Sequence, residues 1–323
     1  MLTFLAGMEV DPAYMRRRLG PSLGLGVVSF VGPFVVTSLV AYFILDWSTR
    51  ASLIAGTALS TTSLAVVYAV LVERGLTHTA AGKLLMSATF VTDLCTALAL
   101  SAIFIKPNLW FPVFVVVSLA VILLLPRLGP WFFGRYGDRV IEPEIKLVFA
   151  CLLLLVVLAD ASNGQAVLPA FVLGLVMSRH YQAHREEQKR LRVVAFAFLT
   201  PFFFLKGGLN VSLEAVFANL GLLAVLFAAK MVPKLGLVFP LARRAEPRHA
   251  PFITLLMSTG LTFGTISALY GLNAGIIDRT QFSLLVTVVV LSAIVPTAIA
   301  QWRYSPLGDL DRHTHPVPVE EYI

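Results

Sequence analysis

Long apolar runs separated by short polar segments make up almost the whole chain. Ten runs approach the roughly 20 residues that a helix needs to cross a bilayer. They cover residues 21–45, 52–72, 83–105, 108–128, 145–161, 163–179, 193–210, 215–240, 249–271 and 280–302. Residues 1–10 look like the end of an eleventh run. Because the apolar residues are nearly continuous, with no alternation at every second position, the pattern predicts membrane helices and not barrel strands.

Composition agrees with this pattern and excludes several classes of protein. The 323 residues are 58% hydrophobic and 13% charged, with a mean hydropathy of +0.84. Soluble domains carry about 25% charged residues, so a soluble enzyme, a disordered chain and a disulfide scaffold are all excluded. The expected fold class is an all-α polytopic membrane protein, with 1–323 forming a single transmembrane domain. Cys95 and Cys151 lie inside apolar runs and are expected to be buried thiols.

The basic residues predict an orientation. When the spans alternate in direction, 19 of the 25 lysines and arginines fall on one side of the membrane. Only Arg50, Lys106 and Arg279 fall on the other. Cytoplasmic loops carry the excess of basic residues, so the C-terminus is expected to be cytoplasmic in a multi-pass protein of the cell membrane. Because the basic residues lie between the apolar runs, we interpret them as topology signals, so no nucleic-acid partner is expected.

Four ionisable residues lie away from the ends of the predicted spans: Lys206, Lys230, Lys234 and Asp93. A charged group in that position costs roughly 3 kcal/mol or more, so each is a candidate functional residue. For the lysines, and especially Lys206, snorkelling to the interface is the competing interpretation. The short side chain of Asp93 does not reach the interface in this way.

Asp93 and Lys234 are expected at almost the same depth. Asp93 follows the cytoplasmic end of its span at Lys83 by ten residues, or about 15 Å of helix. Lys234 precedes the cytoplasmic end of its own span at Arg243 by nine residues. We therefore expect the two groups to be neighbours, or to compete for the same proton and ion. Pro233 is expected to kink the lysine-bearing helix.

Two spans contain residues that permit a break in the helix near this depth. One break is expected at 60–63, which includes Thr62 and Ser63. The other is expected at 258–262, through Ser258, Thr259, Gly260 and Thr262. Unwound backbone at the bilayer centre is tolerated only where it is buried in protein or lines a polar cavity.

The order of these spans predicts an inverted repeat. Residues 1–128 are expected to form the first repeat, residues 145–303 the second, and residues 304–323 a short tail. Corresponding spans run in opposite directions, an arrangement typical of secondary transporters with a site at the midplane. A carboxylate facing broken helices suits a proton or a monovalent cation. No histidine or cysteine cluster, nucleotide motif or nucleophile–base pair accompanies it, so no cofactor, resident metal or enzymatic activity is expected.

Several segments, in order and spacing, resemble the monovalent cation/proton antiporter superfamily, specifically its Kef-type and bacterial sodium/proton antiporter branch. The segments are residues 1–10, 56–63, 90–93, 201–208 and 257–264. The resemblance implies two crossing broken helices, a homodimer, and exchange of Na⁺ or K⁺ for protons by alternating access. It implies that Asp93 binds the cation or the proton and that Thr62 and Ser63 lie at the crossing point. We expect Thr92, Thr62 and Ser63 to complete the coordination. It also implies that Lys234 is the basic residue that compensates charge. Lys230, one turn away, and Lys206 are further candidates for that role, although the resemblance does not point to them.

The chain departs from this family in several places. Thr92 stands where electrogenic members carry a first acid, Lys206 stands where the family is usually apolar, and about two N-terminal helices are expected to be missing. These departures leave two alternatives open. One is a non-transporting relic or regulatory subunit of the same fold, and the other is an anion pathway that uses the three lysines.

Overall fold

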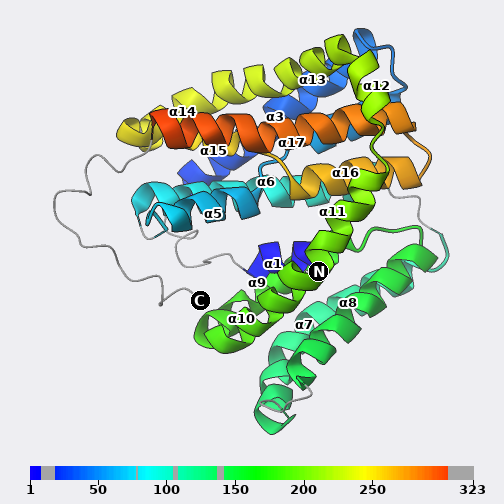
Figure 1. Cartoon of the computed structure of the whole chain (residues 1–323). Helices are drawn as coiled ribbons and strands as arrows, with labels where there is room; N and C mark the ends of the chain where they lie inside the picture. Colours follow the sequence, from blue (N-terminus) through cyan, green and yellow to red (C-terminus); the bar gives the residue numbers. More distant parts are fainter. Residues whose placement is uncertain (9–18, 78, 105–107, 137–141, 305–323) are drawn as a thin grey trace.

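The computed structural model describes residues 1–8, 19–77, 79–104, 108–136 and 142–304. All regular elements in these ranges are helices (Figure 1). In the first half they are α1 (Leu2–Met8), α3 (Leu19–Phe43), α4 (Thr49–Ser60), α5 (Leu64–Glu73), α6 (Ala80–Phe104), α7 (Phe111–Tyr136) and α8 (Pro143–Ala161). The expected all-α polytopic fold is confirmed.

The second half contains more and shorter elements. It begins with α9 (Val167–Ala183), α10 (Arg185–Val194), the π-helical turn η1 (Ala195–Leu199), α11 (Thr200–Leu209) and α12 (Leu213–Ala218). It continues with α13 (Leu220–Pro233), the π-helical turn η2 (Lys234–Val238), α14 (Phe239–Ala245) and the 3₁₀ turn η3 (Pro247–His249). It ends with α15 (Ala250–Met257), α16 (Thr262–Asn273) and α17 (Arg279–Arg303).

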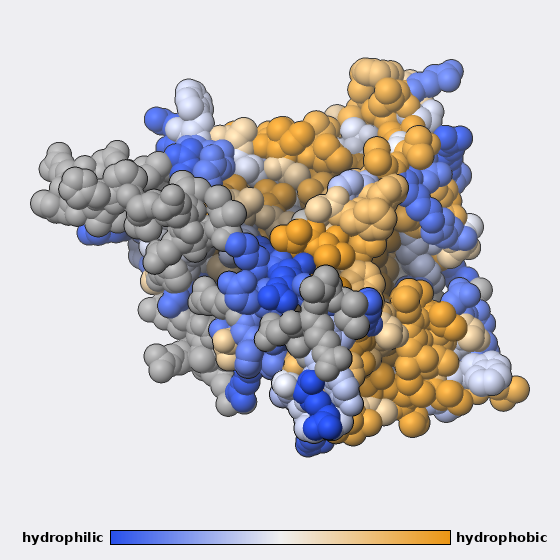
Figure 2. Space-filling model, turned by 60° about the horizontal axis from the view of Figure 1, so that its bottom comes forward, coloured by the Kyte–Doolittle hydropathy of each residue, from blue (hydrophilic) through white to orange (hydrophobic). Residues whose placement is uncertain are grey.

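Eight helical segments in the described residues are long and apolar enough to cross a membrane. They match eight of the ten predicted spans. The other two predictions fall on α8 and α9, helices of 19 and 17 residues that are not among the eight. Figure 2 shows broad hydrophobic areas on one face of the molecule, as expected of a surface that lipid covers.

Both predicted breaks are confirmed. The span Thr49–Glu73 is interrupted at residues 61–63, between α4 and α5, and the span Pro247–Asn273 is interrupted at 258–261, between α15 and α16. Ser63 is the N-cap of α5, and its side chain accepts a hydrogen bond from the backbone N–H of Val66. Hydroxyl residues favour such caps because they satisfy amides that lack a helical partner.

Small residues let these segments approach closely. A Cβ atom on Gly264 would lie 2.8 Å from the carbonyl oxygen of Ala58, so α16 crosses α4 almost backbone to backbone. Gly7 of α1 and Gly174 of α9 meet in the same way, because a Cβ on either would collide with the other helix's backbone. Interfaces between membrane helices are rich in small residues for this reason.

Aromatic packing joins α6, α9 and α16 next to the breaks. The rings of Phe90 and Phe171 stack with their centroids 5.1 Å apart, and Phe263 meets Phe171 edge to face at 6.1 Å. All three side chains are buried. Because Asp93 lies three residues after Phe90 on α6, this cluster fixes the position of the helix that carries the acid.

Candidate functional site

Asp93 lies on the wall of a cavity of about 290 Å³. Its side chain is only 1% exposed, deep within α6. The cavity is lined by Thr62 and Ser63 of the first break, by Thr262 and Phe263 of the second broken span, and by residues from α1, α5 and α10. The structure thus brings the predicted acid and both broken helices to one space.

Lys234 ties the two breaks together. Its ammonium group donates hydrogen bonds to the Thr61 carbonyl (2.9 Å), the Thr62 hydroxyl (2.9 Å) and the Met257 carbonyl (2.8 Å). An ammonium group has three N–H donors, so all of them are used. The Thr62 hydroxyl in turn donates to the Met257 carbonyl at 2.8 Å. The lysine therefore occupies oxygens of the kind that would otherwise coordinate a cation.

Lys230 lies one turn earlier on α13 and is as deeply buried as Lys234. Within the described residues its ammonium nitrogen has no hydrogen-bond partner. This nitrogen lies so close to Gly260 of the second break that a Cβ on that glycine would collide with it. After Pro233 the helix changes from an α-helix to a π-helical turn at Lys234.

Residues of the second break have different surroundings. The Ser258 hydroxyl donates to the Thr254 carbonyl and the Thr259 hydroxyl to the Leu256 carbonyl, so both point back onto α15. Gly260 allows the close approach of Lys230, and Thr262 lines the cavity. Of the four predicted residues, Thr262 is therefore the one on the cavity wall.

Two predicted site residues lie elsewhere. The Thr92 hydroxyl donates to the Ala88 carbonyl at 3.0 Å and lies 3.3 Å from the Gly26 carbonyl of α3. Consecutive helical residues are rotated by about 100°, which turns Thr92 away from the cavity that Asp93 lines. Lys206 is exposed in the last turn of α11 and does not belong to the buried lysines. The core position that we expected for Lys206 is therefore not the one in the structure.

Arg192 and Tyr68 form a part of the cavity wall that the sequence analysis did not anticipate. The guanidinium carbon of Arg192, on α10, lies 5.0 Å from the centre of the Tyr68 ring on α5, which is a cation–π distance. Both residues line the space that reaches Asp93. No sequence motif links them, because α5 and α10 are far apart in the chain.

A second cavity of about 700 Å³ is lined by residues that include Arg50, Asp160 and Asn163. Asp93 is not among its lining residues. The predicted topology assigns Arg50 and Asp160 to the side of the membrane opposite to Arg192. Of these two cavities, the one that Asp93 lines is the one that also contacts α10.

The family model for transmembrane sodium/hydrogen exchangers matches residues 1–302. This chain belongs to that family. The exchanger is therefore a secondary transporter of the cation/proton antiporter type and not an enzyme, as the sequence segments implied.

Individual relatives can be aligned with most of this chain. It is 26% identical to the probable Na⁺/H⁺ antiporter 3 of Methanocaldococcus jannaschii, over 92% of this chain and 79% of that protein. It is 24% identical to the Na⁺/H⁺ antiporter NhaS4 of Synechocystis, over 92% of this chain and 78% of that protein. A glutathione-regulated potassium-efflux system protein of Haemophilus influenzae is 25% identical over 93% of this chain, which spans 51% of its length.

Proposed function

We propose that this exchanger moves Na⁺ or K⁺ in one direction and protons in the other, by alternating access around Asp93. The observation that carries the proposal is the position of this carboxylate. It is buried, it lines a cavity, and it shares that cavity with Thr62 and Ser63 at the first helix break. Relatives named for sodium and for potassium support a monovalent cation without choosing between the two.

The chemistry of exchange follows from competition for one carboxylate. Ionised Asp93 attracts a cation, to which the hydroxyl oxygens of Thr62 and Ser63 add further ligands. Protonation removes the negative charge and releases the cation, so the two ions leave the site by turns. Acidification should therefore raise the cation concentration needed for half-maximal exchange, and alkalinisation should lower it.

Lys234 contributes charge compensation in this proposal. Its ammonium holds the Thr61 and Met257 carbonyls, which face the crossing of the broken helices. A positive charge already at the crossing keeps the binding of a second cation reversible. Thr92 is left out of the coordination because its hydroxyl is bonded to backbone carbonyls. Lys206 is left out because it is exposed.

Topology and assembly complete the proposal. We infer a multi-pass protein of the cell membrane with a cytoplasmic C-terminus, since most basic residues fall on that side. The cavity at Asp93 then opens toward the cytoplasm, because Arg192 belongs to the basic side. We also infer a homodimer and the inverted repeat of 1–128 and 145–303. These inferences are tested by labelling single cysteines from each side and by cross-linking in the native membrane.

The decisive experiment measures proton movement in vesicles that contain the purified protein. A pH-sensitive dye reports the response to pulses of Na⁺, K⁺, Li⁺ and Cl⁻. We expect a cation-dependent signal in wild type, its loss in Asp93→Asn, and its retention in Asp46→Asn. Asp46 is a matched control because it is exposed and has a positive φ of 54°, which asparagine also tolerates. Full exchange in Asp93→Asn would disprove the mechanism.

The same ion series separates the alternatives. A response that depends on chloride alone would indicate an anion pathway, and no response in any salt would indicate a non-transporting relative. Of the three lysines that favoured an anion, Lys206 is exposed and Lys234 has all its donors engaged. Cation exchange is thus the function that the site supports best.

A further inference from the structure

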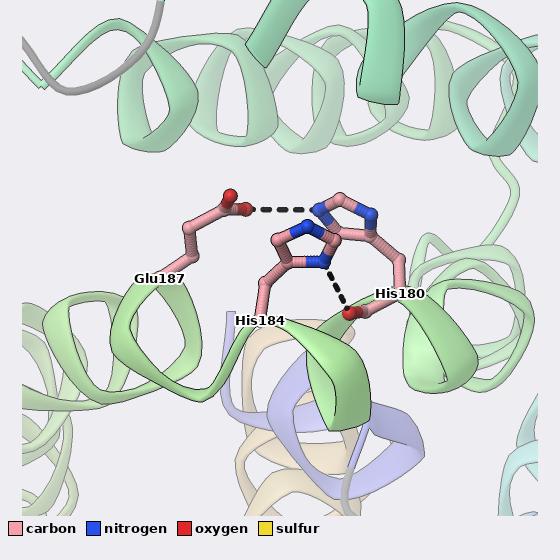
Figure 3. A group of neighbouring side chains, drawn as sticks. All are labelled: His180, His184 and Glu187. Atoms are coloured by element: carbon pink, nitrogen blue, oxygen red, sulfur yellow. Dashed lines mark hydrogen bonds and ion pairs between the residues drawn. The ribbon is translucent and has the colours of Figure 1, made fainter. Parts of the chain in front are cut away.

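Three side chains that could bind a metal ion converge where α9 meets α10. They are His180 in the last turn of α9, His184 at the junction and Glu187 in the first turn of α10. Figure 3 shows the two rings and the carboxylate pointing toward one another. None of the three lines the cavity at Asp93. The proposed exchange does not use them, so their convergence needs a separate explanation.

The distances already approach those of a metal site. His180 Nε2 lies 2.9 Å from Glu187 Oε2, and the two imidazole rings stack with centroids 4.4 Å apart. One ligand atom from each residue lies within 4.8 Å of the other two. Ligands of a tetrahedral zinc ion at about 2.0–2.2 Å lie roughly 3.4 Å from one another. Small side-chain rotations would bring all three atoms to that separation.

The hydrogen bond made by His184 prepares that histidine for a metal. His184 Nδ1 lies 3.0 Å from the carbonyl oxygen of His180. A carbonyl can only accept, so Nδ1 carries the proton and Nε2 keeps its lone pair. Metal-binding histidines characteristically donate their other N–H to a carbonyl or a carboxylate in this way. The Phe133 ring, 5.3 Å from the His180 ring, restricts that ring from the side of α7.

We propose that His180, His184 and Glu187 form a binding site for a divalent transition-metal ion, with Zn²⁺ as the best fit. Two imidazoles and one carboxylate are a common zinc ligand set, and water fills the fourth position. Hard ions such as Mg²⁺ and Ca²⁺ require more oxygen ligands than this group offers. The bound ion would replace the proton that His180 Nε2 donates to Glu187, which is released to solvent, and would tie the end of α9 to the start of α10.

This tie would reach the transport cavity through α10. Arg192 lies five residues after Glu187 on that helix and contacts Tyr68 on the cavity wall. A metal ion that fixes the α9–α10 junction therefore holds Arg192 in place beside the space that leads to Asp93. We expect bound Zn²⁺ to slow exchange, because alternating access requires the wall of this cavity to move. This second effect rests on the proposed function, whereas metal binding does not.

Binding is tested on the full chain in detergent, purified with a tag that contains no histidine. Calorimetric titration with Zn²⁺ should give one tight site per chain, and Co²⁺ should give the visible absorption of tetrahedral coordination. We expect His184→Ala and Glu187→Gln to weaken binding by about tenfold or more. Glu186→Gln and His249→Ala are the matched controls, because they change an exposed neighbouring acid and a histidine outside the cluster.

Unchanged Zn²⁺ affinity in both site variants would overturn the proposal. It would show that the metal is held elsewhere, for example by His313 and His315 near the C-terminus, or that the cluster is only a hydrogen-bonded pair. Glu187→Gln keeps the shape of the side chain, so loss of binding in this variant is not explained by unfolding. Binding is measured in Asp93→Asn as well. Retained binding there, without exchange, separates the metal site from the transport site.

Zn²⁺ is then added to both faces of the proteoliposomes. A slower dye response in wild type that is absent in His184→Ala and Glu187→Gln would support the link to transport. Equal inhibition in wild type and both variants would overturn that link.

Discussion

Lys230 and Lys234 differ in what surrounds them, although they lie one turn apart on the same helix and both are fully buried. All three donors of Lys234 are bonded to oxygens of the two helix breaks. The nitrogen of Lys230 has no hydrogen-bond partner in the described part of the chain. Burial alone therefore does not define the role of a lysine in a membrane. The comparison indicates that Lys234 stabilises the crossing of the broken helices, whereas burial of the Lys230 ammonium lowers the stability of the fold.

Replacing Lys234 should have the largest effect. Lys234→Met removes three charge-assisted hydrogen bonds and leaves buried oxygens with fewer donors, so we expect a loss of about 3 kcal/mol in unfolding free energy. Thermal unfolding of the detergent-solubilised protein measures it. An unfolding temperature equal to that of wild type would show that the three hydrogen bonds contribute nothing net.

Gly260→Ala is expected to come next. The new methyl group would collide with the Lys230 ammonium and lie 3.0 Å from the Thr61 hydroxyl, which should cost about 2 kcal/mol. The double variant Gly260→Ala/Lys230→Ala should recover part of this loss. If the double variant is no more stable than Gly260→Ala in thermal unfolding, Lys230 is not the group that requires glycine at this position.

Thr62→Val tests one arm of the Lys234 contacts. Valine keeps the shape but removes the hydroxyl that accepts from Lys234 and donates to the Met257 carbonyl, so we expect a loss of about 1 kcal/mol. Thr96→Val is the control, because its hydroxyl bonds only to the Thr92 carbonyl within α6. A similar small effect in both variants would mean that the bridge between the breaks is no stronger than an ordinary intrahelical contact.

Lys230→Met should have the smallest effect, and one of opposite sign. An apolar side chain of similar length replaces a buried ammonium without a partner, so stability should stay equal or rise by about 1 kcal/mol. The dye assay then shows whether exchange needs the amine. A clear loss of stability would break the comparison, because it would show that Lys230 is satisfied as well as Lys234.

Local chemistry made part of this architecture predictable. The hydroxyl and glycine clusters correctly placed both breaks, because few other residues tolerate unwound backbone at the membrane centre. The depth estimate brought Lys234 and Asp93 to the same region, since rise per residue is constant in a helix. The depth estimate did not identify the hydrogen-bond partners of Lys234. These are oxygens at the two helix breaks, and their contact with Lys234 depends on how its helix packs against both broken spans.

Side-chain direction was the main source of error. Thr92 directly precedes Asp93 in sequence but faces α3, and only the helix packing reveals which face each residue occupies. Lys206 looked like a core residue because its span is apolar, but its side chain is exposed. The His180, His184 and Glu187 group was also missed. Its signal was present as two histidines four residues apart with an acid three residues later, a spacing that places ligands on one side of a helical segment.

The three contacts of Lys234 have a stoichiometric consequence. A protonated amine offers three N–H groups to three oxygens, whereas a neutral amine offers two. Loss of a single proton therefore leaves one oxygen among Thr61, Thr62 and Met257 short of its lysine donor and available to another positive group. The loss of one proton from Lys234 would therefore open one coordination position among oxygens that belong to both broken helices.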